Sequence, residues 1–219
     1  VFEDADLDAA VEGAMIAKYR NSGQTCVCAN RILVHDKVHD AFVAKLVAAV
    51  GKLKVGNGLE AGVAQGPLID APSLEKVEEL VADALAKGAK VAFGGKRHSL
   101  GATYYEPTVL TEASPTMRIA HEEVFGPVAP VFRFSSEDEA IAMANDTEFG
   151  LAAYFYSRDV GRAWRLSSAL EYGMVGVNTG LISTAVAPFG GVKQSGMGRE
   201  GSSLGIEEYL DTRYVCMAG

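Results

Sequence analysis

Stretches with a helical spacing of apolar residues alternate along this chain with short runs of consecutive apolar residues. An apolar residue stands at every fourth position from Leu7 to Tyr19, a spacing that predicts an amphipathic helix. Asp4 or Asp6 can accept the first free N–H groups of that helix. The same two patterns predict the remaining elements: helices at 42–50, 73–87, 136–145 and 160–170, and strands at 32–34, 90–93, 105–110, 128–134, 151–156 and 174–178.

The order of these elements, with helices between strands, is typical of an α/β fold whose mostly parallel, twisted sheet is flanked by helices. A chain of 219 residues is long enough to bury a substantial core. From Gly205 the pattern changes to a short helix or turn, followed by the apolar run Tyr214-Val215-Cys216. We therefore predict one main domain over 1–204 and, over 205–219, a terminal strand segment that pairs outside its own domain.

The composition narrows the range of partners. The net charge is −8 and the pI about 5.1, whereas binding to nucleic acid requires a basic surface for the phosphates. No apolar run approaches the ~18–20 residues of a membrane span, and no basic and apolar leader opens the chain. Three cysteines, two of them separated by one residue, do not form the pattern of a disulfide framework. These features favour a cytoplasmic protein, and the opening Val1-Phe2-Glu3-Asp4 resembles mid-protein sequence.

The first candidate catalytic residue is Cys26, which lies in the run Asn21-Ser22-Gly23-Gln24-Thr25-Cys26-Val27-Cys28-Ala29-Asn30-Arg31. The cysteine follows a glycine at a predicted turn between a helix and a strand, where a substrate can reach its sulfur. Because only the thiolate is nucleophilic, an exposed turn with free backbone N–H groups suits a covalent catalyst. The alternative is a buried structural cysteine. The histidines lack the spacing of metal ligands, so no metal site is expected: His35, His39, His98 and His121.

Two further motifs lie toward the C-terminus. The run Glu122-Glu123-Val124-Phe125-Gly126-Pro127 is an acidic and aromatic loop that ends in a turn, and periodicity alone does not distinguish it from a solvated surface loop. The run Gly196-Met197-Gly198-Arg199-Glu200-Gly201 satisfies the G-x-G-x-x-G pattern. Polar residues precede it and the chain ends soon after, so we interpret it as a chance match and not as a dinucleotide-binding fingerprint.

The segment Gly23-Gln24-Thr25-Cys26 closely resembles the active-site cysteine signature of the aldehyde dehydrogenases, and Cys26-Val27-Cys28-Ala29-Asn30 resembles the succinate-semialdehyde dehydrogenase branch. Residues 122–127 match the family's Glu-Glu-x-Phe-Gly-Pro motif, and residues 188–196 are also similar to family sequence. The resemblance extends over the whole chain. It implies the fold of the catalytic domain.

The resemblance also implies roles for individual residues. Cys26 would be the nucleophile, and its thiolate would form a thiohemiacetal and then a thioester. Glu123 would bind the ribose hydroxyls of NAD or NADP, and Phe125 would pack near the nicotinamide ring. Phe189 would line the substrate tunnel, although core packing beneath a glycine turn is almost as plausible an interpretation. Cys28 would be either a small buried residue or a redox partner that forms a strained disulfide with Cys26.

Arg20 and Ser183 are the candidates for substrate recognition. Arg20 lies six residues before Cys26 at the end of a predicted helix, and arginine is well shaped to bind a carboxylate at two points. In the resembling branch, the positions that match Arg20 and Ser183 help to hold the distal carboxylate of the substrate. Succinate semialdehyde is the first expected substrate and glutarate semialdehyde the second. The alternative for Arg20 is a cation that binds the last carbonyls of its helix.

The resemblance covers only the C-terminal, catalytic part of the family. The dinucleotide-binding domain, the general-base glutamate and the oxyanion-hole amide would all precede Val1, so we expect a fragment that is inactive alone and a homodimer or homotetramer as the whole protein. Two other functions remain open. One is a stand-alone cysteine thioesterase or acyltransferase, which needs a base near Cys26. The other is a non-catalytic module that assembles through its terminal strand.

Overall fold

A four-stranded sheet with the strand order β1-β4-β3-β2 forms the centre of the protein, for which a computed structural model describes all of residues 1–219. β1 and β3 run parallel to β4, while β2 is antiparallel to β3. β4 is the most buried strand, with six of its seven residues buried, because it lies between two neighbouring strands and two helical layers. The strands span Ile32–His35 (β1), Lys90–Phe93 (β2), Thr108–Ala113 (β3) and Val128–Phe134 (β4).

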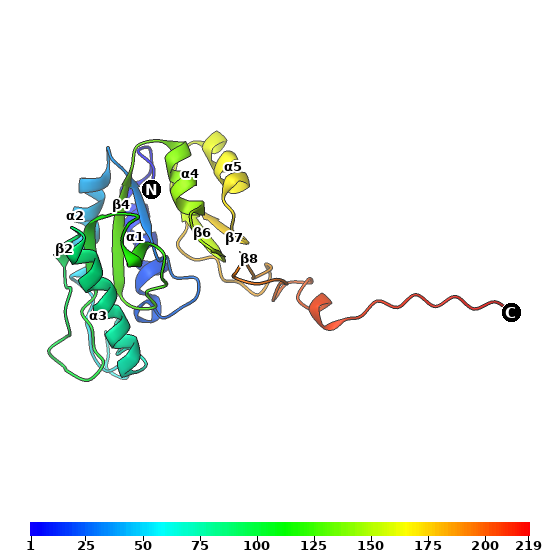
Figure 1. The fold of residues 1–219 in the computed structure, drawn as a ribbon, viewed down its shortest axis with the longest axis horizontal. Helices are drawn as coiled ribbons and strands as arrows, with labels where there is room; N and C mark the ends of the chain where they lie inside the picture. Colours follow the sequence, from blue (N-terminus) through cyan, green and yellow to red (C-terminus); the bar gives the residue numbers. More distant parts are fainter.

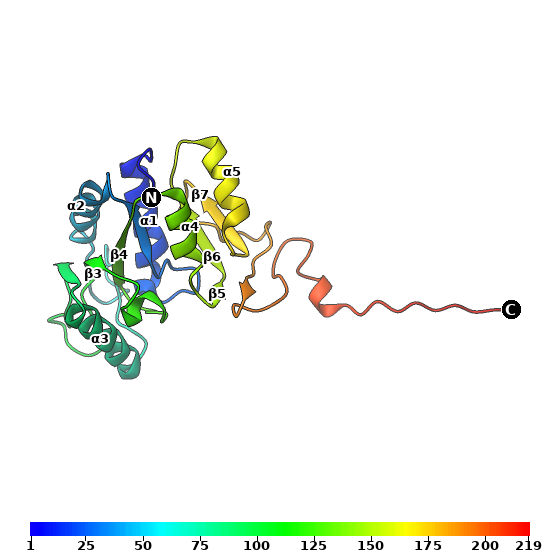
Figure 2. The ribbon, with the colours of Figure 1, turned by 45° about the horizontal axis from the view of Figure 1, so that its top comes forward.

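Helices cover both faces of this sheet (Figures 1 and 2). Alternate residues of a strand point to opposite faces. Accordingly, Val109 and Val131 pack with α1 (Leu7–Tyr19) and α2 (His39–Val50) in one core cluster. Leu110 and Val128 pack with α3 (Ala71–Ala86) in the other. The cysteine signature follows α1 directly and therefore lies at the edge of the α1 layer.

The second half of the chain builds two small sheets beside the first (Figure 2). β6 is parallel to β7, and β5 is antiparallel to β8. A third core cluster joins the two halves through Phe134, Phe155 and Leu166. The elements span Glu137–Asn145 (α4), Phe149–Gly150 (β5), Ala152–Phe155 (β6), Val160–Ala169 (α5), Met174–Val177 (β7) and Val192–Lys193 (β8), with short 3-10 helices at Arg20–Gly23, Arg118–Ala120 and Glu207–Tyr209.

The helix and strand predictions hold, with shifts at some ends. Asp6, not Asp4, caps α1, and its carboxylate accepts hydrogen bonds from Asp8 N and Ala9 N. Asp4 instead accepts from the backbone of Arg158, a contact between distant segments that local sequence cannot reveal. The strand predicted at 105–110 lies at 108–113, and the two-residue strands β5 and β8 carry too short a pattern to predict. The expected mostly parallel sheet is correct, but it is divided among three sheets.

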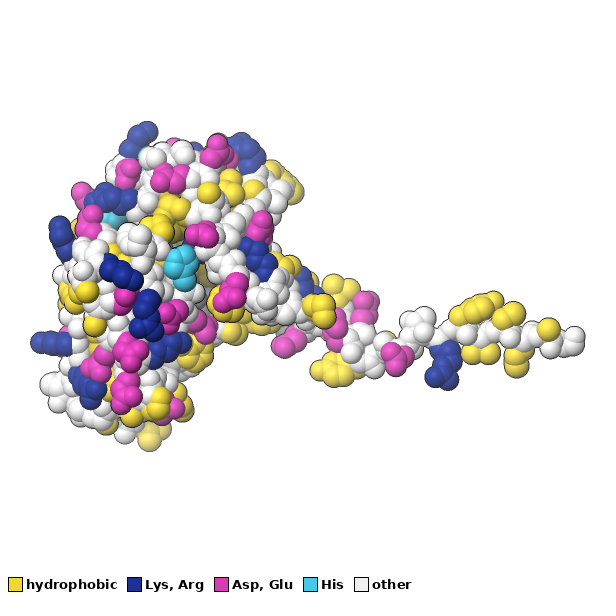
Figure 3. Space-filling view, in the orientation of Figure 1, with side chains coloured by type: hydrophobic (Ala, Val, Ile, Leu, Met, Phe, Trp, Pro, Cys, Tyr) yellow, Lys and Arg dark blue, Asp and Glu magenta, His cyan; other side chains and the backbone are white.

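The C-terminal segment differs from the rest of the molecule. After the 3-10 helix at Glu207–Tyr209, the chain extends away from the body without regular structure (Figure 1). Tyr214 and Val215 are 87% and 68% exposed, and the space-filling view shows apolar side chains along this extension (Figure 3). The predicted terminal strand therefore has no partner strand within this chain, and its pairing with another chain stays a prediction. No helix combines the length and the apolar character needed to cross a membrane.

Candidate active site

Cys26 lies at the tip of a hydrogen-bonded turn. Cys28 N–H donates to the Thr25 carbonyl at 2.9 Å, which places Cys26 and Val27 at the two central positions. Val27 is buried and its carbonyl accepts a hydrogen bond from the Tyr154 hydroxyl at 2.8 Å, whereas Cys26 is exposed. The Cys26 N–H has no acceptor within the chain. The turn thus presents a thiol and a free N–H donor together, which is the arrangement that an oxyanion next to the sulfur needs.

The residues before this turn adopt unusual backbone angles. Asn21, Ser22 and Gly23 have φ values of 50°, 56° and 75°, in the left-handed region that only glycine adopts without strain. Side-chain contacts hold this conformation: Ser22 Oγ donates to Gly66 O, and Gln24 Oε1 accepts from Ile69 N at 2.9 Å. The segment 21–30, which we call the cysteine turn, is therefore fixed on the loop that precedes α3.

The cysteine turn packs directly against residues 122–127, which we call the acidic loop. A Cβ added to Gly23 would lie 2.1 Å from the Gly126 carbonyl oxygen, so the two backbones approach as closely as glycine allows. Asn30 binds the same loop from the other end of the turn. Its Nδ2 donates to the carbonyls of Ile119 and Glu122, and its Oδ1 accepts from Val124 N at 2.8 Å. Two motifs almost a hundred residues apart in sequence therefore form one unit.

Within the acidic loop, both predicted cofactor residues are accessible. Glu123 is exposed, lines the same cavity as Cys26 and Cys28, and has no hydrogen bond or ion pair within the chain. Its neighbour Glu122 is instead bound by Arg118 in a two-point ion pair. Phe125 is 37% exposed and has a φ of 49°. This backbone conformation is strained for a residue with a bulky side chain, and such strain is common at binding sites. Glu123 thus offers a carboxylate with no partner within the chain, which fits a vicinal diol because a diol donates two hydrogen bonds.

Arg20 directly follows α1 beside the cysteine turn. Its carbonyl accepts from Cys28 Sγ at 3.8 Å, and its positive charge acts on the Tyr154 hydroxyl. Burial raises the pKa of Tyr154 to about 12, and the Arg20 charge opposes that rise. The guanidinium forms no ion pair and donates no hydrogen bond to a helix carbonyl, so the helix-end alternative gains no support. Arg20 is available for an anion near the thiol.

The other two predicted substrate residues lie on the long loop, residues 178–191. A Cβ added to Gly176 would lie 2.9 Å from both Ile182 Cγ2 and Tyr154 Cδ1, so the start of this loop packs beside the tyrosine that supports Val27. Ser183 itself is exposed. Phe189 is half-buried and pairs with Glu200 through two backbone hydrogen bonds of 2.7 and 2.8 Å. The structure therefore brings the loop near the cysteine turn but shows no contact from Ser183 to Cys26 or Arg20.

Lys18 is a residue of this region that sequence analysis missed. It lies in the last turn of α1 and is 1% exposed, and it forms no ion pair within the chain. Burial lowers its pKa from 10.5 to about 8, while the charges of Cys28 and Glu123 oppose the shift. Its neighbour Ala17 accepts from Ala29 N at 2.9 Å, which places Lys18 directly behind the cysteine turn. Tyr154 and Asn30 were also missed, because each was assigned only to a predicted strand or its flank.

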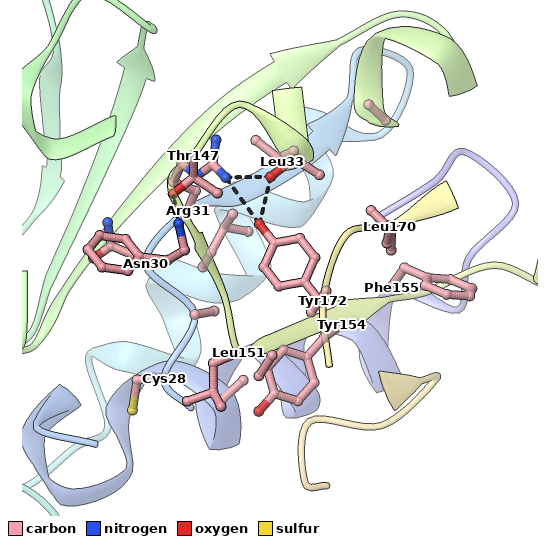
Figure 4. Close-up of a pocket in the computed structure, with 18 of the residues that line it drawn as sticks. Cys28, Asn30, Arg31, Leu33, Thr147, Leu151, Tyr154, Phe155, Leu170 and Tyr172 are labelled. Atoms are coloured by element: carbon pink, nitrogen blue, oxygen red, sulfur yellow. Dashed lines mark hydrogen bonds between the residues drawn. The ribbon is translucent and has the colours of Figure 1, made fainter. Parts of the chain in front are cut away.

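A cavity of about 440 Å³ opens at this site and runs between β1 and β6 (Figure 4). Of its 32 lining residues, 24 are hydrophobic. Cys26, Cys28 and Glu123 lie along it, and Arg31 and Tyr172 close one side by hydrogen bonds to each other and to the Ala144 carbonyl. The G-x-G-x-x-G run 196–201 lies in a loop after the two-residue strand β8. Only the three-residue 3-10 helix at Glu207–Tyr209 follows it and no α-helix does, so the run lacks the context of a dinucleotide fingerprint.

Comparison with known proteins agrees with this geometry. Residues 1–215 match the model of the aldehyde dehydrogenase family, and the chain belongs to that family. It is 65% identical to a glutarate-semialdehyde dehydrogenase of Pseudomonas aeruginosa and 59% identical to an NADP(+) succinate-semialdehyde dehydrogenase of Escherichia coli, over 100% and 99% of the chain. A crystal structure of succinate-semialdehyde dehydrogenase from Burkholderia pseudomallei superimposes with a TM-score of 0.98 at 65% identity, over the whole chain. The chain spans about 45% of the length of each of these proteins.

Proposed function

We propose that this chain is the cysteine-bearing part of an NAD(P)-dependent dehydrogenase that oxidises a semialdehyde, with succinate semialdehyde first and glutarate semialdehyde second. The observation that carries the proposal is the packing of the exposed Cys26 turn against the loop of the unpaired Glu123. A thioesterase or a scaffold has no use for a carboxylate held in this way. The names of the similar proteins support a small aldehyde with an anionic end.

In this mechanism Cys26 Sγ attacks the aldehyde carbon, and the Cys26 N–H donates to the oxyanion of the thiohemiacetal. Glu123 would hold the ribose hydroxyls of NAD or NADP, which would supply the hydride acceptor for this site. Hydride loss leaves a thioester on Cys26, which water cleaves to release the acid. The buried Val27 and the Tyr154 hydroxyl keep the turn in place while the exposed thiol reacts.

The first test concerns the nucleophile. In the full-length protein, Cys26→Ala should lower kcat by about a thousandfold or more, because loss of a covalent nucleophile removes the main pathway. Cofactor binding, measured by fluorescence titration, should stay unchanged. A Cys28→Ala variant is the matched control two residues away and should keep most of its turnover. Loss of activity in Cys28→Ala with retention in Cys26→Ala would contradict the assignment.

A second test concerns the substrate. Arg20→Ala should raise KM for succinate semialdehyde by about ten- to a hundredfold, the cost of one lost charge-assisted hydrogen-bonded contact. KM for butanal, which has no carboxylate, should change little. Equal losses on both aldehydes would show that Arg20 supports the fold.

The remaining roles are also proposals. The 219-residue chain alone should show no NAD(P)-linked activity, and the whole protein should be a cytoplasmic homo-oligomer that pairs through 205–219. Under peroxide, Cys26 and Cys28 should form a disulfide that dithiothreitol reverses. Peptide mass mapping checks this, and oxidation of Cys26 only to the sulfinic acid would count against it.

A further inference from the structure

Lys18 is a buried titratable residue beside the cysteine turn, and the proposed mechanism gives it no part. It is 1% exposed and forms no ion pair within the chain. Lysine is almost never fully buried without a partner, because an ammonium group loses its hydration there. This chain alone covers the side chain, so the groups that face the ammonium belong to this chain. The charges around Lys18 therefore indicate what its own charge does.

The end of α1 that carries Lys18 is packed directly on the cysteine turn. Ala29 N donates to Ala17 O at 2.9 Å, and Cys28 Sγ donates to Arg20 O at 3.8 Å. These two contacts come from the residues on either side of Lys18 along the chain. The first negative group that acts on the ammonium is accordingly the thiol of Cys28, whose charge opposes the fall in the pKa of Lys18 that burial causes.

The second negative group that acts on Lys18 is the carboxylate of Glu123 in the acidic loop. Asn30 binds the backbone on both sides of this residue. Its Nδ2 donates to Glu122 O at 2.9 Å, and its Oδ1 accepts from Val124 N at 2.8 Å. The segment that carries the carboxylate is therefore fixed to the cysteine turn. The Lys18 ammonium thus faces one acidic group from each of the two motifs.

A thiolate in the cysteine turn and the Glu123 carboxylate are like charges on two adjoining segments. Each disfavours the ionised form of the other, whereas an opposite charge that faces both favours both ionised forms. We propose that Lys18 is a positioning residue whose buried ammonium supplies this opposite charge, so that the thiolate and the Glu123 carboxylate exist together. The inference rests on the proposed function, because it concerns the same thiol and carboxylate, and it adds a counter-charge for them.

The other titratable groups of the site have different partners. Glu122 is bound by Arg118 in a two-point ion pair. Burial raises the pKa of Tyr154 to about 12, so its hydroxyl stays neutral at pH 7. Arg20 is a second cation at the end of α1, and its charge acts on the Tyr154 hydroxyl. Lys18 is therefore the cation that faces the thiol and the carboxylate together.

Alkylation by iodoacetamide measures the thiolate directly, because the thiolate and not the thiol is the nucleophile. In the full-length protein, without cofactor or aldehyde, Lys18→Met should slow alkylation of Cys26 and Cys28 at pH 7 by about three- to tenfold, since one nearby opposite charge is removed. Peptide mass mapping follows the two cysteines separately. Lys45→Met, at a half-exposed lysine on α2, is the matched control and should leave both rates unchanged.

The pH profile separates the charge of Lys18 from its packing. The pKa of Lys18 is about 8, so the wild-type residue loses its own charge as the pH rises above that value. The alkylation rates of the wild type and of Lys18→Met should therefore converge toward pH 10. Equal slowing at every pH would show that Lys18 only supports the shape of the turn, and no slowing at any pH would show that its charge does not reach the thiols. Either result would overturn the proposal.

A double-variant cycle tests the link to Glu123. If Lys18 offsets the repulsion from this carboxylate, Glu123→Gln combined with Lys18→Met should regain most of the alkylation rate at pH 7. The same slowing by Lys18→Met in both backgrounds would contradict the proposal. Glu123→Gln alone changes an exposed residue and is informative even if Lys18→Met fails to fold. It should alkylate at least as fast as the wild type, and slower alkylation would overturn the proposal.

These measurements are independent of turnover. If Cys26→Ala kept its activity, the proposed function would fail, and the alkylation profiles of the Lys18 variants would still test the counter-charge. If instead the profiles showed no effect of the Lys18 charge, the assignment of Cys26 as the nucleophile would be untouched. The two failures are therefore distinguishable.

Discussion

The acidic loop and the long loop both carry predicted site residues, but the two loops differ in how firmly the rest of the chain holds them. The acidic loop is held by two hydrogen bonds with Asn30, one donated to Glu122 O and one accepted from Val124 N, and by the close approach of Gly23 to Gly126. Much of the long loop lies on the surface, with Leu181 53% and Val186 85% exposed. The difference teaches that the residues assigned to thiol and cofactor chemistry are held within this chain. Of the residues assigned to substrate choice, Ser183 lies on the surface of the long loop, whereas Arg20 lies beside the cysteine turn.

The largest effect is expected from Gly23→Ala. The added Cβ would meet the Gly126 carbonyl oxygen at 2.1 Å, and the φ of 75° disfavours alanine. We expect a loss of about 3 kcal/mol or more in the free energy of unfolding, from strain and forced displacement of the acidic loop. Gly196, beyond the long loop, also has a positive φ but no neighbour within 4 Å, so Gly196→Ala should cost only about 1 kcal/mol. Equal losses in urea unfolding would remove the distinction between the two regions.

The next largest effect on the free energy of unfolding is expected from Asn30→Ala. Three hydrogen bonds are lost at roughly 1 kcal/mol each, so the expected loss is about 2–3 kcal/mol. Amide exchange at Val124, whose N–H donates to Asn30 Oδ1, reports the local effect. The counterpart beside the long loop is Asn178, which makes two hydrogen bonds to the Ser157 backbone at a φ of 54°. Because glycine tolerates that φ, Asn178→Gly removes these two hydrogen bonds without adding backbone strain. Amide exchange at Val124 should stay unchanged in this variant.

The Lys18→Met variant tests the effect on stability of the buried lysine charge behind the cysteine turn. The pKa of Lys18 is lowered to about 8 in the folded protein against 10.5 when unfolded, so the unfolded state binds its proton more tightly between these values. The destabilisation caused by burying the charged Lys18 ammonium is fully present below pH 8. It is relieved as the pH rises toward 10.5. The variant should gain roughly 2–3 kcal/mol at pH 7 and lose this pH-dependent rise. Lys45→Met, at a half-exposed lysine, is the control, and destabilisation by Lys18→Met would reveal an anionic partner for the ammonium.

The smallest effect is expected from Ser183→Ala in the long loop. The side chain is exposed, so the free energy of unfolding should change by less than about 0.5 kcal/mol. KM for succinate semialdehyde should rise by about three- to tenfold, the value of one hydrogen bond, while KM for butanal stays constant. A clear loss of stability would show that the loop is held as firmly as the acidic loop.

The sequence alone determined most of the elements and supplied the candidate reactive groups. Apolar periodicity placed α1 to α5 and most strands to within a few residues, because each buries one stripe or face of its own sequence. The cysteine signature and the acidic motif were readable because they are local strings of residues. Their contact was not readable from composition or spacing, since Asn30 and Val124 are brought together by the pairing of β1 with β4.

Tertiary structure alone decided the rest. It selected Asp6 over Asp4 as the cap, because Asp4 is taken by the backbone of Arg158 on a distant segment. It buried Lys18 and aimed Tyr154 at Val27, although both look ordinary in a helix and a strand. Side chains record which face of an element is buried, whereas contacts between distant elements depend on how those elements pack, so only the assembled fold shows them.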